Sequence, residues 1–220
     1  MTDFFWDKFY KKKGQNFFWP WTDLVTLINK YPNKKKKISI LEIGIGNGAN
    51  VPFYLSKKFD VYGVDRSKQA INILKKRFPK LRNNFFAEDF ALKRFKKRFD
   101  LIVDRGSISC GNDLNQIKII ISLIELYLKK KGLFIGVDLY SKSSSYFKNK
   151  VNNKISKKNY FSFNSGPFAG MGNIFFFSFN DIKKKFKNFN IIDLNEKKIS
   201  NYKSIKKNIF ASWTLVAKKR

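Results

Sequence analysis

Three glycines lie close together in the sequence, directly after an apolar run and before a segment of helical character. Gly44, Gly46 and Gly48 fall within the stretch ISILEIGIGNGANVPFYL, residues 38–55. Because glycine leaves a loop without side chains, backbone N–H groups and the N-terminus of the next helix can come close to a ligand. Phosphates, dinucleotides and adenosine-type cofactors are all held by such loops, so the glycines alone do not identify the ligand.

Acidic residues around the loop help to indicate which of these ligands it binds. The segment that opens at Gly44 satisfies the dinucleotide fingerprint G-x-G-x-x-A, and Asp65 follows at about the 20-residue spacing of a ribose-binding acid. Glu42, however, ends the first predicted strand, where a carboxylate favours a cationic cofactor and repels a pyrophosphate. Asp65 ends the second predicted strand and can accept hydrogen bonds from both hydroxyls of a ribose. Asp89 and Phe90 follow the third, where they can hydrogen-bond to an adenine and stack on it.

A parallel sheet is needed to bring these residues to one edge. From residue 38, short apolar runs alternate with helical periodicity, which indicates βαβ units. The predicted strands cover residues 38–43, 59–64, 84–86, 99–103, 133–137, 191–194 and 209–217. The predicted helical faces comprise Ala70, Ile73, Leu74 and Phe78, then Leu114, Ile117, Ile121, Ile124 and Leu128, and last Ile182, Phe186 and Phe189, after a capping-box-like pair of Ser178 and Asp181.

Two segments lie outside this pattern and are expected to cover the site. Residues 1–37 are predicted to form an N-terminal helical cap, because DFFWDKFYKKK and WTDLVTLINKY have the character of short helices, the second ending at Pro32. Residues 38–220 form the α/β domain, in which residues 139–173 lack a clear period and form an insertion with glycine hinges. The alternative for the N-terminal segment is plain packing on the sheet.

Cysteine content and hydropathy limit the class of protein. The 220-residue chain has one cysteine, Cys110, which excludes an internal disulfide framework and favours a reducing compartment. No stretch approaches the roughly 18 apolar residues of a membrane span, and the N-terminus lacks the apolar core of a signal peptide. We therefore expect a cytoplasmic protein with no membrane partner.

The charge is strongly positive, at +30, from 46 Lys plus Arg against 16 Asp plus Glu. Such an excess ordinarily suggests a nucleic-acid partner. Here it is mainly lysine, accompanied by abundant Asn, Ile, Phe and Tyr, and all these residues have A/T-rich codons. Arginine, which base and phosphate readers favour, is scarce. A nucleic-acid partner is thus possible but not favoured.

The pattern as a whole resembles the class I S-adenosylmethionine-dependent methyltransferases. The resemblance rests on E-x-G-x-G-x-G from Glu42, on the acids after the second and third strands, and on a final helix and two strands that end in SWTLVAKK. Motifs support the resemblance over residues 38–138, and only the order of helices and strands supports it over the rest of the chain. It implies a Rossmann-like α/β fold with a seven-stranded, mostly parallel sheet, a reversed C-terminal strand and helices on both faces. One departure is Lys131, where a glycine is common.

The resemblance also implies roles for individual residues. Glu42 and the three glycines would line the methionine part of S-adenosylmethionine, and Asp65 would bind the ribose. Asp89 and Phe90 would flank the adenine, while Asp104 would border the sulfonium. No metal is expected, because no Asp-Asn pair follows the fifth predicted strand.

Catalysis of methyl transfer depends mainly on positioning, because in-line displacement gains about 7–11 kcal/mol from well-oriented groups. The chain has no histidine, so a base would be a carboxylate, Tyr, Lys or Cys. We predict Asp104 and Arg105 as the catalytic residues, with Asp113 and Asp138 as other candidate bases. Arg105 would hold an anionic acceptor, or would pair with Asp104 or with the cofactor carboxylate. Cys110 is expected to pack rather than to attack the substrate.

These observations favour methyl transfer to an oxygen or nitrogen atom of a small-molecule or sugar-like acceptor. An RNA methyltransferase is one alternative, and a contiguous basic stripe at the pocket mouth would favour it. A non-catalytic cofactor-binding or interaction protein is the other, and the lack of an acceptor site would favour that.

Overall fold

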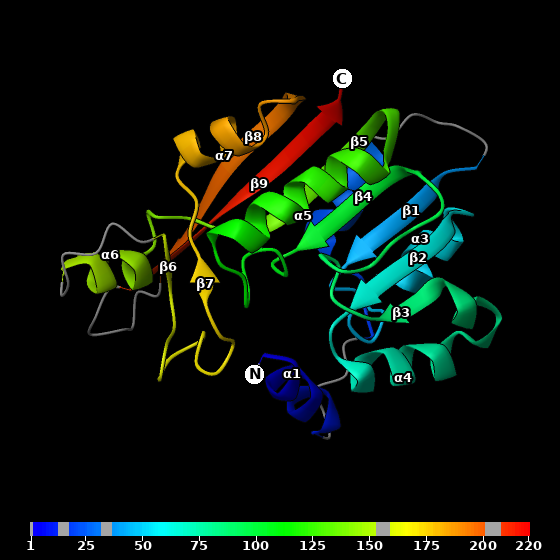
Figure 1. Cartoon of the computed structure of the whole chain (residues 1–220), viewed down its shortest axis with the longest axis horizontal. Coiled ribbons are helices and arrows are strands. Elements are labelled where there is room, and N and C mark those ends of the chain that lie inside the picture. Colours follow the sequence, from blue (N-terminus) through cyan, green and yellow to red (C-terminus); the bar gives the residue numbers. More distant parts are fainter. Residues whose placement is uncertain (1, 13–17, 32–36, 153–158, 201–207) are drawn as a thin grey trace.

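A seven-stranded sheet forms the centre of the computed structural model, which describes residues 2–12, 18–31, 37–152, 159–200 and 208–220. The strand order is β3-β2-β1-β4-β5-β9-β8 (Figure 1). The strands of this sheet are β1 (Ser39–Ile43), β2 (Asp60–Asp65), β3 (Phe85–Ala87), β4 (Phe99–Arg105), β5 (Leu128–Tyr140), β8 (Phe189–Ser200) and β9 (Ile209–Lys219). The pairs from β3 to β5 are parallel, whereas β9 runs antiparallel to both β5 and β8. The predicted Rossmann-like fold with a reversed C-terminal strand is confirmed.

Helices cover both faces of the sheet because side chains that alternate along each strand point to opposite sides. One face packs against α2 (Thr22–Lys30), α3 (Val51–Ser56) and α4 (Lys68–Arg77). The other packs against α5 (Leu114–Tyr127) and α7 (Phe179–Lys185), which lie in front of the sheet in Figure 1. In β1, for example, Ile40 belongs to the first core and Leu41 to the second.

Side-chain caps fix where these helices begin. Asp113 accepts hydrogen bonds from the backbone N–H groups of Asn115 and Gln116 at 2.8 and 2.9 Å, and so starts α5. The predicted capping box at α7 is present, with Ser178 Oγ accepting from Asp181 N at 3.1 Å. These contacts satisfy N–H groups that have no partner within the helix.

Three details differ from the sequence-based expectation. Phe189 was expected on the last helix, but α7 ends at Lys185 and Phe189 begins β8. Its ring still lies 5.6 Å from that of Phe186, so a strand residue fills the place that helical periodicity suggested. In α4 the buried isoleucine is Ile71, whereas Ile73 is only partly buried. Strand β5 begins at Leu128, before Lys131, which adopts the positive φ of 63° that glycine accommodates more easily.

Most of the remaining elements lie beyond the carboxyl ends of the parallel strands. Helix α1 (Thr2–Lys11) sits below the arrowheads of β1, β2 and β4 in Figure 1, between α4 and β7. Helix α6 (Ser145–Asn152) and the small sheet of β6 (Tyr160–Phe161) and β7 (Ile174–Phe175) lie at the β8 side of the molecule, and the 3₁₀ helix η1 (Pro79–Asn84) leads into β3. The expected helices at both ends of the N-terminal segment are thus present, although Pro32 lies outside the described residues.

Helix α1 is tied to the sheet domain by two sets of contacts. Asp7 Oδ1 accepts hydrogen bonds from Ser67 Oγ at 2.6 Å and from Gln69 N at 3.0 Å, so α1 supplies an acceptor to the first turn of α4. At its other side Phe5 packs on Gly170, where an added Cβ would lie 2.8 Å from the ring.

Among the described residues, none of the helices has the length and apolar character that a membrane span requires.

Candidate active site

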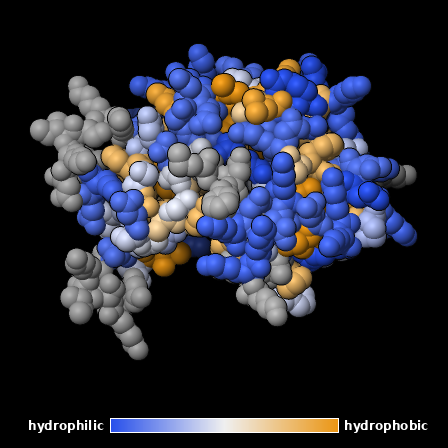
Figure 2. Space-filling view, turned by 60° about the horizontal axis from the view of Figure 1, so that its bottom comes forward, coloured by the Kyte–Doolittle hydropathy of each residue, from blue (hydrophilic) through white to orange (hydrophobic). Residues whose placement is uncertain are grey.

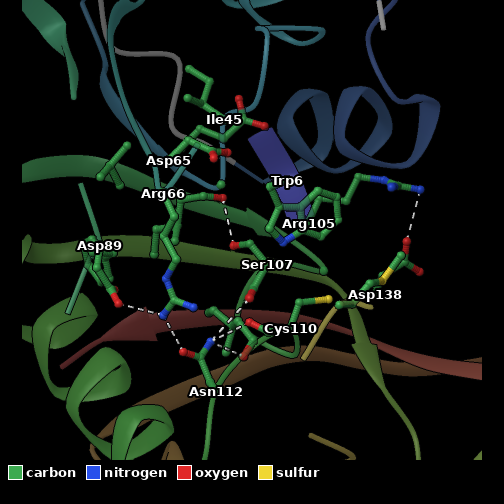
Figure 3. Close-up of a pocket in the computed structure, with 18 of the residues that line it drawn as sticks. Trp6, Ile45, Asp65, Arg66, Asp89, Arg105, Ser107, Cys110, Asn112 and Asp138 are labelled. Atoms are coloured by element: carbon green, nitrogen blue, oxygen red, sulfur yellow. Dashed lines mark hydrogen bonds and ion pairs between the residues drawn. The ribbon is translucent and has the colours of Figure 1, made fainter. Parts of the chain in front are cut away.

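A cavity of about 310 Å³ opens at the carboxyl ends of the parallel strands, close to the lower limit of typical small-molecule sites (Figure 3). It is lined by the glycine loop, by the ends of β2 to β5 and by α1. Its charged lining residues are Glu42, Asp65, Glu88, Asp89, Asp138, Arg66 and Arg105. Five acids and two arginines therefore face this cavity, and no described lysine lines it, although the whole chain carries +30.

Glu42 is the penultimate residue of β1 and is 4% exposed. Its Oε1 accepts a hydrogen bond from Asn50 Nδ2 at 2.7 Å, while Oε2 has no partner among the described residues. Burial raises the pKa of Glu42 to about 8, although the Asn50 hydrogen bond and the nearby buried hydroxyl of Tyr54 oppose this effect. A buried carboxylate oxygen without a partner is costly, so a ligand cation placed here would stabilise the site.

The glycine loop brings the backbone close to other segments. Gly44, with a φ of 68°, has no room for a side chain, because an added Cβ would lie 2.3 Å from the Cβ of Ser107. A Cβ added at Gly46 would lie 2.3 Å from the hydroxyl oxygen of Tyr10 in α1. The loop therefore packs against the β4 end on one side and against α1 on the other.

Asp65 ends β2 and holds the loop in place. Its Oδ2 accepts from Gly46 N and its Oδ1 from Ser67 N, both at 2.8 Å. Burial raises the pKa of Asp65, and these backbone hydrogen bonds counteract the rise. Tyr10 is partly buried beside these acids, and its burial, reinforced by the charges of Asp65 and Glu42, raises the pKa of its hydroxyl.

Arg66 links two walls of the cavity. Its Nη2 lies 2.8 Å from Asp89 Oδ2 and donates to Asn112 Oδ1 at 2.6 Å (Figure 3). Asn112 in turn donates to the carbonyl oxygens of Ile108 and Cys110 at 2.9 and 3.1 Å. The guanidinium thus joins the loop after β3 to the loop after β4, and Asp89 is charge-paired within the protein.

Asp104 lies behind the cavity wall, with a fully buried side chain. Its Oδ1 accepts from Ser107 Oγ in a short hydrogen bond and from Ile108 N at 3.1 Å, while Oδ2 has no partner among the described residues. Burial raises the pKa of Asp104 to about 7. Ser107, which does line the cavity, stands between this carboxylate and the open space.

Arg105 faces the cavity from the end of β4 and is held on three sides. Its Nη2 lies 3.0 Å from Asp138 Oδ2, and its Nε lies 3.6 Å from Asp23 Oδ2 in α2. The guanidinium also stacks on Trp21, 3.6 Å from the ring centroid. The sequence offered Asp104 as a partner for Arg105 within the protein. The structure instead pairs Arg105 with Asp138 and Asp23, which the sequence did not indicate.

Cys110 is buried at the cavity edge, with Sγ 3.8 Å from the hydroxyl oxygen of Tyr140. Burial raises the pKa of its thiol to about 12. A thiol that stays protonated is a poor nucleophile, which agrees with the expected packing role.

Residues 34–188, well over half of the chain, match the family model described as a methyltransferase domain. The chain belongs to this family. With the fold and the cavity described above, it is a class I S-adenosylmethionine-dependent methyltransferase, and its cofactor is S-adenosylmethionine. Curated protein sequences, by contrast, gave no match to the chain.

Solved structures of methyltransferases share this fold. An S-adenosylmethionine-dependent methyltransferase from Methanosarcina mazei is 18% identical, with 88% of this chain and 96% of that chain covered and a TM-score of 0.68. Phosphoethanolamine N-methyltransferase 2 of Haemonchus contortus, bound to S-adenosylmethionine, is 16% identical, with 98% and 56% covered and a TM-score of 0.62. A Burkholderia thailandensis enzyme, 1,6-didemethyltoxoflavin-N1-methyltransferase with S-adenosylhomocysteine bound, is 15% identical, with 90% and 75% covered and a TM-score of 0.60.

The residues that line the methyltransferase cavity fit a cationic cofactor. Glu42 offers an unpartnered buried oxygen, and acids outnumber arginines in the lining. Of the sequence-predicted site residues, the cavity lining includes Glu42, Gly44, Asp65, Asp89, Phe90 and Arg105, whereas Gly46, Gly48 and Asp104 lie behind it. At Gly48 the space for a Cβ is taken by Leu74, 2.3 Å away.

Several lining residues were not singled out from the sequence. Trp6 and Tyr10 belong to the N-terminal segment and Ser107 lies shortly after the fourth predicted strand, but the sequence indicated no individual role for them. Arg66 directly follows Asp65, and its pairing with Asp89 and Asn112 depends on the fold. The available signal was a cation next to Asp65, the acid that the sequence predicts to bind a ribose.

Proposed function

We propose that this methyltransferase transfers the methyl group of S-adenosylmethionine to an oxygen or nitrogen atom of a small-molecule acceptor held in the cavity. One observation carries this proposal: the only charges that line the cavity from the described residues are five acids and two arginines, both of them ion-paired within the protein. A phosphate-rich polymer is repelled by such a lining, whereas a small acceptor that fits beside the cofactor is not.

The proposed cofactor site comprises Glu42, Gly44, Gly46, Gly48, Asp65, Asp89, Phe90 and Asp104. When bound, S-adenosylmethionine supplies an electrophilic methyl group on a positively charged sulfur. Glu42 receives the cationic part of the methionine moiety, and the unpartnered Oε2 supports this role. Asp65 receives the ribose hydroxyls, and Asp89 with Phe90 flanks the adenine, which their positions in the cavity lining support.

Asp104 and Arg105 have different roles in this proposal. Asp104 positions Ser107 through its short hydrogen bond and adds buried negative charge behind the cavity wall. Arg105 forms part of the wall itself, held by Asp138, Asp23 and Trp21. Catalysis then rests mainly on orientation of the acceptor against the methyl group.

The N-terminal segment and the 139–173 insertion serve as covers in this proposal. Trp6, Phe9, Tyr10 and Met171 line the cavity, which supports a covering role for both segments. Asp7 anchors α1 at the first turn of α4. Closure over the acceptor excludes water and fixes its orientation.

A release assay for S-adenosylhomocysteine, run on a panel of metabolites and nucleotide sugars, tests the proposed function. We expect turnover with at least one small molecule and none with mixed RNA at physiological salt. Weak RNA binding that disappears as salt rises is expected for dispersed lysines. Tight, sequence-selective RNA binding at physiological salt would instead favour RNA methylation, and cofactor binding without turnover on any acceptor would favour a non-catalytic role.

A further inference from the structure

The cavity has a second end, away from the proposed cofactor residues. Figure 3 shows Trp6, Arg105 and Asp138 on one side of the cavity and Asp65, Arg66 and Asp89 on the other. We call the first side the acceptor end, and define it by Trp6, Trp21, Arg105, Asp138, Tyr140 and Met171, all of which line the cavity. Its chemistry specifies what kind of acceptor fits.

The charge of the acceptor end is negative although it contains an arginine. The guanidinium of Arg105 lies 3.0 Å from Asp138 and 3.6 Å from Asp23, so two carboxylates surround one cation. Its Nε has no hydrogen-bond partner among the described residues, but it is the atom nearest to Asp23. An anionic acceptor would have to compete with both carboxylates for Arg105, and the group of three carries one net negative charge.

The fold holds the Asp138 carboxylate in a fixed orientation. Asp138 has a φ of 55°, a left-handed conformation that is uncommon for residues other than glycine and occurs most often with Asn and Asp. The register of β5 with β9 shifts between Gly136 and Leu139, so Asp138 sits on a bulge, and Ser212 Oγ donates to its Oδ1 at 2.9 Å. Bulges and left-handed residues often direct a side chain into a functional site.

Aromatic rings line the cavity together with this carboxylate. Trp21 already stacks on the Arg105 guanidinium, and Trp6, Tyr140 and Met171 each pack against the buried cluster that includes Phe168 and Phe176. Ring faces attract cations, and a partly buried carboxylate in the same cavity strengthens the attraction.

We propose that the acceptor end selects a flat, amine-bearing cation and excludes molecules with a carboxylate or phosphate at the same position. The inference rests on the proposed function, since it specifies the acceptor class of that site. Asp138 and the aromatic rings receive the cation, and Arg105, paired with two carboxylates, is part of the wall and not an anion-binding group.

Three indole compounds of similar shape test this inference: tryptamine (cation), tryptophol (uncharged) and indole-3-propionate (anion). Binding of each is measured by calorimetry on protein saturated with S-adenosylhomocysteine. We expect tryptamine to bind most tightly and indole-3-propionate at least about tenfold more weakly, as expected for a partly desolvated charge.

Two variants sharpen the result. Asp138→Asn keeps the left-handed conformation, which Asn tolerates, and should reduce the preference for tryptamine over indole-3-propionate by about tenfold or more. Arg105→Gln removes the cation and should increase that preference. Retained binding of S-adenosylhomocysteine serves as the control that each variant is folded.

Equal or tighter binding of indole-3-propionate to the wild-type protein would overturn the inference, as would lack of binding by all three indoles at millimolar concentration. So would an unchanged preference in Asp138→Asn. If the protein does not bind S-adenosylhomocysteine at all, the proposed function itself fails, and this outcome is distinct from a reversed order of the three probes.

Discussion

The two ends of the parallel strands use acidic residues in opposite ways. At the amino ends, Asp60 and Asp100 each have a lysine partner, with Lys97 Nζ and Lys129 Nζ at 2.8 Å. At the carboxyl ends, Glu42, Asp65 and Asp104 form no ion pair with a described lysine or arginine. Acids at the amino ends are thus paired with lysines, whereas at the carboxyl ends Asp89 and Asp138 pair with arginines and these three acids have no ion pair among the described residues.

This difference shows that net charge is a poor guide to the partner of this protein. The lysine excess lies on the outside, where Figure 2 shows a mainly hydrophilic surface with separate small hydrophobic areas. The site itself is acidic. Uncompensated buried carboxylates cost stability, and a cationic ligand is what makes such an arrangement useful.

The largest expected effect is on cofactor affinity when Glu42 is neutralised. Glu42→Gln keeps the shape but removes the buried charge, and should weaken S-adenosylmethionine binding by about 2–3 kcal/mol or more, as expected for hydrogen bonds to charged groups. Asp100→Asn, at the amino end of β4, is the matched control and should leave affinity unchanged. Equal losses in both variants would contradict the proposed difference between the two ends.

A second, smaller effect compares the two ends of β2. Asp65→Ala should weaken cofactor binding by on the order of 1–3 kcal/mol, because ribose hydroxyls and two backbone N–H groups lose their acceptor. Asp60→Ala removes only a partly exposed ion pair with Lys97. Calorimetry measures the cofactor affinity of both variants. Weakened cofactor binding in Asp60→Ala would contradict the proposed difference between the two ends of β2.

A third prediction concerns the pH dependence of stability without cofactor. The folded-state pKa of Glu42 is raised to about 8 and that of Asp104 to about 7, so both bind protons more readily when folded. Their contribution is full below the unfolded pKa near 4 and is lost as pH rises through the folded values. Thermal unfolding should therefore show a decreasing Tm from about pH 5 to pH 8.5, with a shallower decrease in Glu42→Gln.

Asp100 should affect the pH dependence of stability in the opposite direction to Glu42 and Asp104. Burial alone would raise its pKa, but the Lys129 ammonium and hydrogen bonds from Ser39 outweigh burial and hold the pKa of Asp100 below its ordinary value. Its stabilisation is present above the unfolded pKa and is lost as pH falls through the folded value. Asp100→Asn should accordingly reduce the acid-side loss of Tm and leave the alkaline side unaffected, and a change confined to the alkaline side would argue against this assignment.

The smallest expected effect belongs to the half-exposed lysine at the amino end. Lys129→Ala should cost no more than about 1 kcal/mol in the free energy of unfolding, because exposed ion pairs contribute little. Urea unfolding at two salt concentrations measures this. A larger loss would mean that Lys129 has a role beyond pairing with Asp100.

Much of the sheet, and the placement of Glu42, Gly44 and Asp65 at the cavity, could be predicted because local patterns specify them. Gly44 and Glu42 are two residues apart, and Asp65 ends an apolar strand, so short-range sequence indicates their positions. The length of β5 and the place of Phe189 could not be predicted, because Lys131 takes a left-handed conformation and Phe189 packs on Phe186 as a helical residue would.

The acceptor end was the least predictable part. Arg105 meets Asp23 and Asp138 only after α2, β4 and β5 have assembled, and Asp7 reaches Ser67 across 60 positions. The bulge that orients Asp138 arises from pairing with the last strand. Contacts between distant segments have no local sequence signal, so the roles of Trp6, Tyr10 and Arg66 follow only from the fold.

Proton release on cofactor binding tests the central claim most directly. Titration of S-adenosylmethionine by calorimetry at about pH 6.5, in two buffers with different ionisation enthalpies, counts the protons released. Because Glu42, with a pKa of about 8, is mostly protonated in the free protein, we predict release of close to one proton per site, and little release in Glu42→Gln. Binding with no proton release, and with equal affinity in Glu42→Gln, would contradict the claim that an uncompensated carboxylate at the carboxyl end of β1 receives the cationic cofactor.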